Sequence, residues 1–309
     1  GEGISFSVED KLKIVKSLDD FGISYIEAGN PGSNSKDLEF FKRLDEINLK
    51  NSKIVAFGST RRKGISVEND ANLIALLSAN TPCVAIFGKS WDFHVTDIIR
   101  ATLEENLMMI EDTIKFLKDK GKEVTFDAEH FFDGYKANKE YAISALKSAV
   151  IAGADYLALC DTNGGTFPDE VYEITKLVCD TFPNVSVGIH AHNDCGLGVA
   201  NSIMAVKAGA TQVQGTFTGF GERCGNANLS AIIPNLQVKR DYSCVPNDQI
   251  SNLTSTARYI SEVSNLYLAN SSPYVGDSAF AHKGGMHIDG VNKASHSFEH
   301  IDPQVVGNR

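Results

Sequence analysis

Hydrophobic residues recur along this chain in two alternating patterns. Stretches with a period of about 3.6 residues, typical of amphipathic helices, are each followed by a short apolar run of strand length. The helical pattern predicts helices over residues 8–21, 38–49, 69–79, 95–120, 139–152, 169–181 and 198–208. The apolar runs predict strands over residues 24–28, 53–57, 83–87, 123–126, 156–160, 185–189 and 212–216. This alternation indicates an α/β protein built on a parallel sheet.

Three short segments mark the passage from helix to strand. Residues 21–26, 152–157 and 208–213 each place a glycine after a predicted helix, then a brief loop and the start of a strand. Glycine is common just after a helix because it adopts positive φ without strain. With right-handed crossovers, such a sheet is either open and doubly wound or a closed (β/α)8 TIM barrel.

The two ends of the chain extend this prediction. Because the sequence opens on a loop and a helix, we expect the first strand of a TIM barrel to precede Gly1 and to be missing from this chain. Residues 247–270 predict one more helix, and residues 271–309 are rich in Gly, His and Ser without clear periodicity. We therefore expect a catalytic barrel over residues 1–240 and the start of a helical C-terminal extension over residues 241–309.

Composition narrows the class of protein. The 309 residues are 42% hydrophobic and 22% charged, with a formal net charge of −10. An acidic chain without a long basic run is a poor nucleic-acid binder, so an anionic substrate must be held by local positive groups or a metal. No signal peptide or membrane-length apolar run occurs. The six cysteines include no Cys-x-x-Cys pair, which predicts reduced thiols in a cytoplasmic protein.

The segment His190-Ala191-His192-Asn193-Asp194 follows the apolar run at residues 185–189. Alternate residues of a strand share a face, so His190 and His192 are predicted to point the same way. Two imidazoles on one face near a loop can bind one divalent metal ion. The alternative is that two unrelated histidines cap the strand through hydrogen bonds.

Polar residues also follow the other predicted strands, at the edge where parallel α/β folds collect their functional groups. Each has a structural alternative when taken alone. A carboxylate can cap a helix or neutralise a base, and a basic triplet can be a solvated loop. An Asp-Thr pair can be an N-cap, and clustered glycines can serve a turn. Their common location favours a functional interpretation of the set, which comprises Glu27, Arg61 in the triplet 61–63, His94, Asp127, Glu129, Asp161, Thr162 and the segment 219–226.

Four motifs in this order resemble a known enzyme family. They are Glu27-Ala28-Gly29, Asp161-Thr162-Asn163-Gly164, His190-Ala191-His192-Asn193-Asp194 and Gly221-Glu222-Arg223-Cys224-Gly225-Asn226. The family is that of the Claisen-condensing acyltransferases, which includes isopropylmalate, homocitrate and citramalate synthases and is related to hydroxymethylglutaryl-CoA lyase. The stretches 58–64, 126–136 and 284–290 look particularly like the citramalate synthases.

This resemblance implies a metal-dependent reaction and a role for each matching residue. His190, His192 and Asn226 would bind a divalent ion, either Mg, Mn or Zn. The family's further aspartate ligand lies in a Leu-Arg-Asp-Gly motif that this sequence lacks. Acetyl-CoA would condense with a small 2-oxo acid, here pyruvate, to give (R)-citramalate and CoA in isoleucine biosynthesis, and the enzyme would be a homodimer. Glu129 or His287 would be the base that removes the proton, and Glu222 would orient His287. Thr162 would bind the carboxylate of the 2-oxo acid. Substrate binding is also expected for Glu27, Arg61 and His94.

Three other functions stay open at this point. A sister synthase would use 2-oxoisovalerate or 2-oxoglutarate in place of pyruvate. A lyase of the related class would carry a catalytic cysteine in a Gly-Gly-Cys-Pro loop. At that place this chain reads Gly221-Glu222-Arg223-Cys224, so Cys224 does not stand in the lyase motif. The chain could also be a metal-binding relic without activity.

Overall fold

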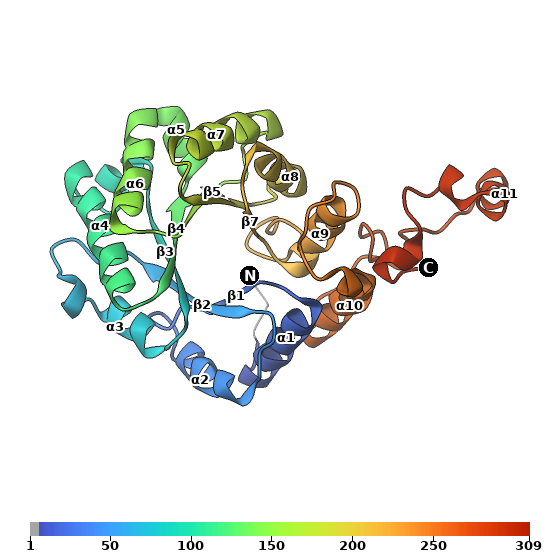
Figure 1. Ribbon diagram of the computed structural model, residues 1–309, viewed down its shortest axis with the longest axis horizontal. Coiled ribbons are helices and arrows are strands. Elements are labelled where there is room, and N and C mark those ends of the chain that lie inside the picture. Colours follow the sequence, from blue (N-terminus) through green and yellow to red (C-terminus); the bar gives the residue numbers. More distant parts are fainter. Residues whose placement is uncertain (1–5) are drawn as a thin grey trace.

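A curved parallel sheet surrounded by helices forms the main body of the molecule (Figure 1). The computed structural model describes residues 6–309. Its seven strands pair in chain order, each parallel to the next, and they confirm the predicted α/β class. The expected strand before Gly1 lies outside the described residues. The strands are β1 (Tyr25–Gly29), β2 (Lys53–Ser59), β3 (Cys83–Lys89), β4 (Glu123–Glu129), β5 (Tyr156–Asp161), β6 (Ser186–Ala191) and β7 (Gln212–Gln214).

The helices that cover this sheet begin and end on local signals in the sequence. Ser7, Asp70 and Thr102 each accept a backbone hydrogen bond at the N-terminus of a helix. Glycines at 22, 153 and 209 end three helices with φ of 99°, 100° and 123°, as their spacing predicts. The helices are α1 (Val8–Phe21), α2 (Ser35–Arg43), α3 (Ala71–Ser78), α4 (Leu103–Asp119), α5 (Phe131–Ala137), α6 (Lys139–Ala152), α7 (Pro168–Thr181), α8 (Gly198–Ala208) and α9 (Leu229–Gln237).

The single helix predicted over residues 95–120 is wrong. A π-helical turn at His94–Ile98 comes first, and α4 begins only at Leu103. Between them Arg100 has a φ of 53°, which a right-handed helix does not allow. Thr102 then caps α4 by accepting a hydrogen bond from the Glu105 N–H at 3.0 Å. Apolar periodicity runs through this break because both pieces pack on the same core.

The two faces of the sheet differ in chemistry. Side chains such as Ile54, Ile86 and Phe126 point outward and form a continuous core with the surrounding helices. The alternate positions point inward and carry mostly polar groups, among them Glu27 on β1 and Asp127 on β4. Strand periodicity therefore separates the residues that stabilise the fold from those that line its interior.

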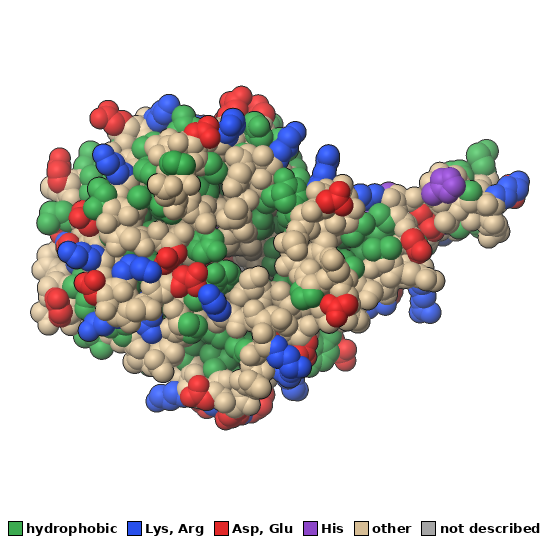
Figure 2. All heavy atoms as spheres, in the orientation of Figure 1, with side chains coloured by type: hydrophobic (Ala, Val, Ile, Leu, Met, Phe, Trp, Pro, Cys, Tyr) green, Lys and Arg blue, Asp and Glu red, His purple; other side chains and the backbone are tan. Residues whose placement is uncertain are grey.

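The C-terminal region is helical, as expected, and contains α10 (Leu253–Val263) and α11 (Gly285–Lys293). Residues Leu253, Ala257 and Ile260 of α10 share a buried cluster with Phe21 of α1, so α10 packs on the main body. Beyond it α11 projects as an arm away from the sheet (Figure 1). Figure 2 shows acidic and basic side chains intermixed over the visible face. Among residues 6–309, none of the helices has the length and apolar character that a bilayer crossing requires.

Candidate active site

His190 and His192 lie side by side at the carboxyl edge of the sheet. β6 ends at Ala191, so His192 is just beyond the strand, where it forms an isolated bridge with Asn226. The ring centroids of the two histidines are 5.2 Å apart. The same loop is tied down by a hydrogen bond from the Ala227 N–H to the Ala191 carbonyl at 3.0 Å. The structure therefore brings together the three residues that the sequence nominated as metal ligands.

Glycines hold the Asn226 side chain in place. A Cβ on Gly221 would lie 2.3 Å from Asn226 Nδ2, and Gly225 has a φ of 95°. Asn226 Nδ2 donates to the Phe220 carbonyl at 3.2 Å, which directs Oδ1 to the other side. These glycines thus serve the turn and also leave room for the Asn226 side chain, so the structural and functional interpretations of the motif are compatible.

Two buried atoms of this group lack a hydrogen-bond partner within residues 6–309. They are Nδ1 of His192 and Oδ1 of Asn226. Burial and the neighbouring His190 lower the pKa of His192 to about 4, so the ring is neutral at pH 7 and has a lone pair to offer. Buried polar atoms without partners are costly, and a ligand would remove that cost. Imidazole nitrogens with an amide oxygen fit a divalent ion.

The His190 ring contacts Gln214, a residue that the sequence did not single out. Its Oε1 lies 2.8 Å from His190 Nδ1, and its Nε2 donates to Asp127 Oδ1 at 3.2 Å. Gln214 ends β7 next to His190 in the sheet register. The alternation Gln212-Val213-Gln214 was the available signal, because it points two polar side chains into the interior.

Carboxylates lie deeper in the interior. Burial and the charge of Asp127 raise the pKa of Glu27, although water reaches the Glu27 side chain. Burial also raises the pKa of Asp127, and His190 and the hydrogen bond from Gln214 partly offset this increase. Of the residues expected to bind substrate, Glu27 is the middle residue of β1, and its side chain is exposed.

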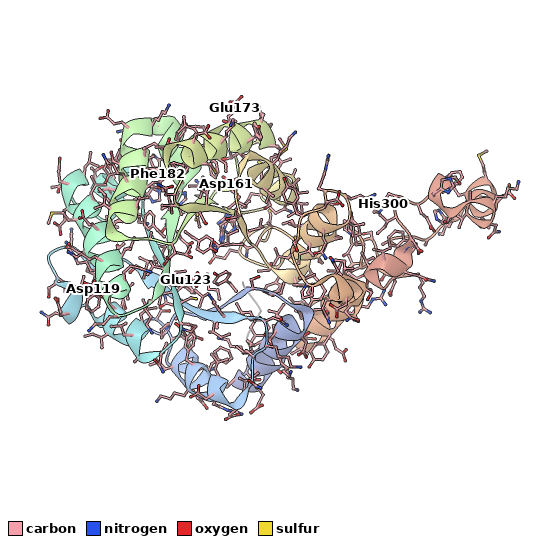
Figure 3. The ribbon with its side chains drawn as sticks, viewed as in Figure 1. Asp119, Glu123, Asp161, Glu173, Phe182 and His300 are labelled. Carbon is pink, nitrogen blue, oxygen red and sulfur yellow. The ribbon has the colours of Figure 1, made fainter. Side chains whose placement is uncertain are left out.

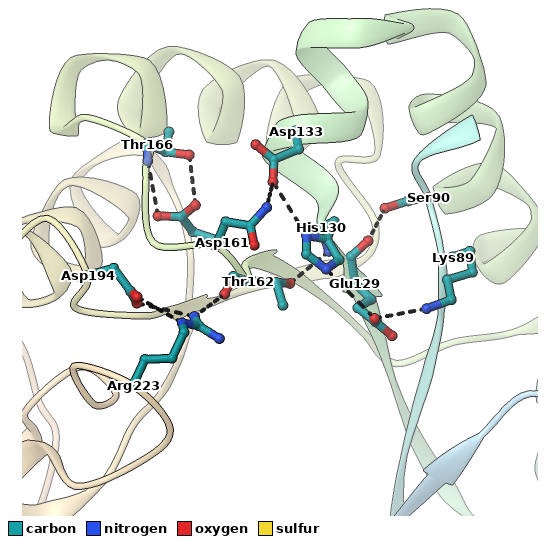
Figure 4. Close-up of polar contacts among 11 residues, drawn as sticks. Lys89, Ser90, Glu129, His130, Asp133, Asp161, Thr162, Thr166, Asp194 and Arg223 are labelled. Atoms are coloured by element: carbon teal, nitrogen blue, oxygen red, sulfur yellow. Dashed lines mark hydrogen bonds and ion pairs between the residues drawn. The ribbon is translucent and has the colours of Figure 1, made fainter. Parts of the chain in front are cut away.

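A second polar group surrounds Glu129 at the end of β4 (Figure 4). Lys89 Nζ lies 2.9 Å from Glu129 Oε1, and His130 Nε2 lies 3.9 Å from the same oxygen. The His94 ring is 4.4 Å from the His130 ring and stacks on Trp91. Burial, His130 and Lys89 lower the pKa of His94. The structure thus brings the predicted residues Glu129 and His94 together.

His94, Glu129 and His130 could also hold a metal ion by geometry. Each offers a ligand atom, and these atoms lie within 4.8 Å of one another. The Lys89 ammonium, however, already occupies Glu129 and would repel a second cation. This argument favours the group formed by His190, His192 and Asn226 as the metal centre.

Thr162 faces the same edge and links the neighbouring loops (Figure 4). Its Oγ1 accepts from the His130 N–H at 2.8 Å, which leaves the hydroxyl proton free to donate. Its carbonyl accepts from Arg223 at 2.6 Å, and Arg223 also pairs with Asp194 at 2.8 Å. Arg223 therefore ties together the loops that follow β5, β6 and β7.

Two further candidate residues have partners within the framework of the fold. Asp161 accepts from the Thr166 hydroxyl at 2.8 Å and shapes the loop before α7, close to the capping role considered from the sequence. Arg61 is buried and pairs with Glu105 at 3.0 Å and Asp112 at 2.9 Å, both on α4. The structure turns Arg61 to the outer helices and does not bring it to the other site residues.

His287 and Glu222 are also apart from this group. His287 lies on α11 in the arm, where its ring stacks on Phe298 at 4.4 Å. Glu222 is exposed on the loop after β7. The structure of one chain thus does not join His287 to Glu129 or Glu222.

Comparison with known proteins places these residues in a family context. A family model described as HMGL-like matches residues 2–260, and one described as homocitrate synthase post-HMGL domain-like matches residues 274–309. Curated proteins named (R)-citramalate synthase match at 46–56% identity. That of Aquifex aeolicus is 56% identical over 308 residues, which are 100% of this chain and 58% of the relative. That of Synechocystis sp. is 53% identical over 316 residues, covering 99% of this chain and 57% of the relative.

More distant relatives share the same region. A 2-isopropylmalate synthase of Oceanobacillus iheyensis is 31% identical over 309 residues, covering 99% of this chain and 58% of the relative. The chain thus spans about 58% of the length of these curated relatives. A solved HMG-CoA lyase of Bacillus subtilis has a TM-score of 0.71 at 20% identity, over 86% of this chain and 90% of that one, which shows a shared fold. Since the HMGL-like model matches well over half of the residues, the chain belongs to the HMGL-like family.

Proposed function

We propose that the protein is an acyltransferase that condenses acetyl-CoA with pyruvate and hydrolyses the thioester to give (R)-citramalate and CoA. The observation that carries this proposal is the pair of buried atoms on His192 and Asn226, beside His190, that have no hydrogen-bond partner among residues 6–309. Pyruvate is favoured because identity to the citramalate synthases, 46–56%, exceeds the 31–33% to the isopropylmalate synthases.

His190, His192 and Asn226 would hold a divalent Mg, Mn or Zn ion. When bound, the ion would supply Lewis acidity to the keto carbonyl of the 2-oxo acid. The chain's own contribution at His192 is a neutral imidazole, since the pKa of that ring lies far below 7.

Thr162 is proposed to bind the carboxylate of the 2-oxo acid. Its hydroxyl proton is free because Oγ1 already accepts from the His130 N–H. His94 and Glu27 are proposed to line the same substrate space, with His94 held in place by its contacts with Trp91 and His130. Arg61 is left out of this proposal because its guanidinium is engaged by α4.

Glu129 is proposed as the base that removes a methyl proton from acetyl-CoA. The Lys89 ammonium at 2.9 Å fixes its carboxylate at the edge of the sheet. The electron pair of the broken C–H bond forms the new C–C bond to C2 of pyruvate, and the keto oxygen gains a proton. Water then cleaves the thioester and releases CoA. A correctly placed base of this kind contributes about 10²–10⁴-fold to a rate.

We further propose a homodimer in which α11 of a second copy brings His287 toward Glu222 and Glu129. The supporting observation is the arm itself, on which Met286 is 78% exposed and Ile288 46% exposed (Figures 1 and 2). Mixing inactive Glu129→Gln and His287→Ala chains tests this. An equimolar mixture should regain about a quarter of wild-type activity if His287 acts on the other copy, because about half of the dimers are hybrids and each hybrid has one complete site of two. Mixtures that stay inactive would count against the shared site.

The function itself is tested by CoA release from acetyl-CoA with pyruvate, 2-oxoisovalerate or 2-oxoglutarate, and with none as a blank. Release should depend on pyruvate, stop on metal chelation and return with added Mg²⁺, Mn²⁺ or Zn²⁺. A strong preference for 2-oxoisovalerate would point to a sister synthase. Failure with every acid would favour an inactive relic.

Two variants refine this assay. Glu129→Gln should lower kcat by at least about 100-fold while metal affinity stays near wild type. His130→Ala separates the two candidate metal groups, because it should leave metal affinity unchanged if His190, His192 and Asn226 bind the ion.

The six cysteines are free thiols, which supports a reducing cytoplasmic location.

A further inference from the structure

We infer that Gln214 is a positioning residue that, held by Asp127, sets the protonation pattern of the His190 ring. The inference rests on the proposed metal centre and names what prepares one of its ligands. Gln214 and Asp127 lie on different strands, β7 and β4, and both point into the interior beneath His190.

The contacts form a short chain across the inner face of the sheet. His190 Nδ1 lies 2.8 Å from Gln214 Oε1. Gln214 Nε2 donates at 3.2 Å to Asp127 Oδ1 and at 3.1 Å to Gln212 Oε1. One side of the amide thus faces a ring nitrogen, and the other side faces two oxygens.

This arrangement decides which way the amide points. An amide has two N–H donors on nitrogen and only acceptor capacity on oxygen. Rotating Gln214 by half a turn would place its oxygen against the Asp127 carboxylate oxygen, which would repel it. The orientation that faces Oε1 toward His190 is therefore the stable one.

The amide orientation then determines the ring. Since Gln214 Oε1 can only accept, His190 Nδ1 must carry the hydrogen. The form of the ring that binds a metal ion is the neutral one, with a single N–H, and in that form Nε2 of His190 keeps its lone pair and is the nitrogen available to the ion. The hydrogen bond also fixes the orientation of the ring, so less rotational freedom is lost when a metal ion binds. Loss of such a partner typically lowers metal affinity 10–100-fold.

The sequence explains why this group is easily overlooked. Asp127 and Gln214 are 87 residues apart, and neither is a ligand in the proposed centre. The parallel register His190↔Gln214 brings the amide to the ring, and the curvature of the sheet brings Asp127 to the amide.

The inference is tested first without any metal. In the metal-free protein, long-range proton–nitrogen NMR of the histidine rings reports which nitrogen carries the hydrogen, and a His190→Gln variant assigns the signal. Wild type should show His190 protonated on Nδ1. Gln214→Met, which keeps the length and removes the acceptor, should give a mixture of the two forms. Binding of Mn²⁺ measured by calorimetry should weaken by 10–100-fold.

Matched variants separate positioning from a general effect on the interior. Gln212→Met removes one of the two acceptors of Gln214 Nε2 and leaves Asp127 Oδ1 in place, so the ring pattern should stay unchanged. Asp127→Asn retains an oxygen acceptor and should behave like wild type, whereas Asp127→Leu should release the amide and mix the two forms. Thermal unfolding confirms that each variant is folded.

The outcomes distinguish this inference from the proposed function. Nδ1 protonation in wild type and its loss in Gln214→Met support the positioning role, even if Mn²⁺ does not bind; that result would remove only the metal centre. Unchanged ring protonation and Mn²⁺ affinity within about 2-fold in both Gln214→Met and Asp127→Leu would overturn it.

Discussion

Polar groups at the two ends of the inner face of the sheet differ in whether they have hydrogen-bond partners. At the amino end, Glu123 accepts from the Tyr25 hydroxyl at 2.8 Å and from the Cys83 thiol at 3.0 Å, and it lies 3.4 Å from Lys53 Nζ. Figure 3 shows Glu123 inside the ring of strands. At the carboxyl end, Nδ1 of His192 and Oδ1 of Asn226 are buried without partners in the described part of the chain.

This difference separates stability from function. Paired polar groups at the amino end recover the cost of burial and brace the strands where they begin. Unpaired groups at the carboxyl end leave that cost in place until a ligand arrives. In parallel α/β barrels the two ends are divided in the same sense. Variants at the two ends should therefore change different measured quantities.

The largest expected effect is at the carboxyl end. His192→Ala should weaken Mn²⁺ binding by at least about 100-fold, since it removes a ligand of the proposed centre. The free energy of unfolding should change by less than about 1 kcal/mol, because the lost imidazole nitrogen had no partner. Calorimetry and urea unfolding measure the two quantities, with exposed His296→Ala as control. A large loss of stability would erase the contrast between the two ends.

The opposite outcome is expected for Glu123→Ala at the amino end. It leaves the Tyr25 hydroxyl, the Cys83 thiol and Lys53 without their acceptor, which should lower the free energy of unfolding by about 3 kcal/mol. Mn²⁺ affinity should remain at the wild-type value. Glu173→Ala, an exposed glutamate on α7, is the matched control for urea unfolding. A change in metal affinity without a change in stability would reverse our assignment.

Stability measured against pH tests another paired group near the amino end of the strands. Asp19 on α1 accepts hydrogen bonds from the loop that leads into β2. Burial would raise the pKa of Asp19, but hydrogen bonds from the N–H groups of Lys50, Asn51 and Ser52 outweigh it and lower the pKa below 3.8. The stability that Asp19 contributes is therefore present above pH 3.8 and is lost as pH falls through the lower folded value.

Asp19→Asn removes this charge and should cost about 2 kcal/mol at pH 7. The difference in unfolding free energy between wild type and variant should shrink as the pH falls below 3.8. Urea unfolding from pH 7 to pH 2.5 follows it. A difference that stays constant over this range would mean that Asp19 acts through packing and not through its charge.

The smallest effect is expected for Cys224→Ser. Cys224 is exposed on the loop after β7 and makes no contact that the proposed reaction needs. CoA release should stay within about 2-fold of wild type, because a hydroxyl replaces a thiol that no proposed step uses. A loss beyond tenfold would move the mechanism toward that of the lyases.

Local patterns predicted much of this fold. All seven strands and the three C-terminal glycine caps follow from apolar runs and from the position of glycine, and the structure confirms them. The break before α4 was missed, because Arg100 and Thr102 are compatible with a helix until their own conformation is known. Helices α5 and α9 were also not predicted, since they contain Gly134 and Pro234, residue types that helix interiors disfavour.

The candidate site could be predicted only in part. The strand pattern identified His190 and His192, the family resemblance added Asn226, and the structure places the three together. The pairing of Arg61 with α4 could not be foreseen, because a basic loop carries no information on which carboxylates will face it.

By itself the sequence determined which strands form, which face of each is polar and which residues end at the carboxyl edge, because these follow from periodicities of neighbouring residues. Only the tertiary structure decided which of those polar groups find partners. Glu123 and Gln214 are both inward-facing polar residues on strands, yet one completes a paired network and the other orients a histidine. The physical reason is that hydrogen bonding depends on atoms within about 3 Å, and the curvature of the sheet brings those atoms from distant parts of the chain.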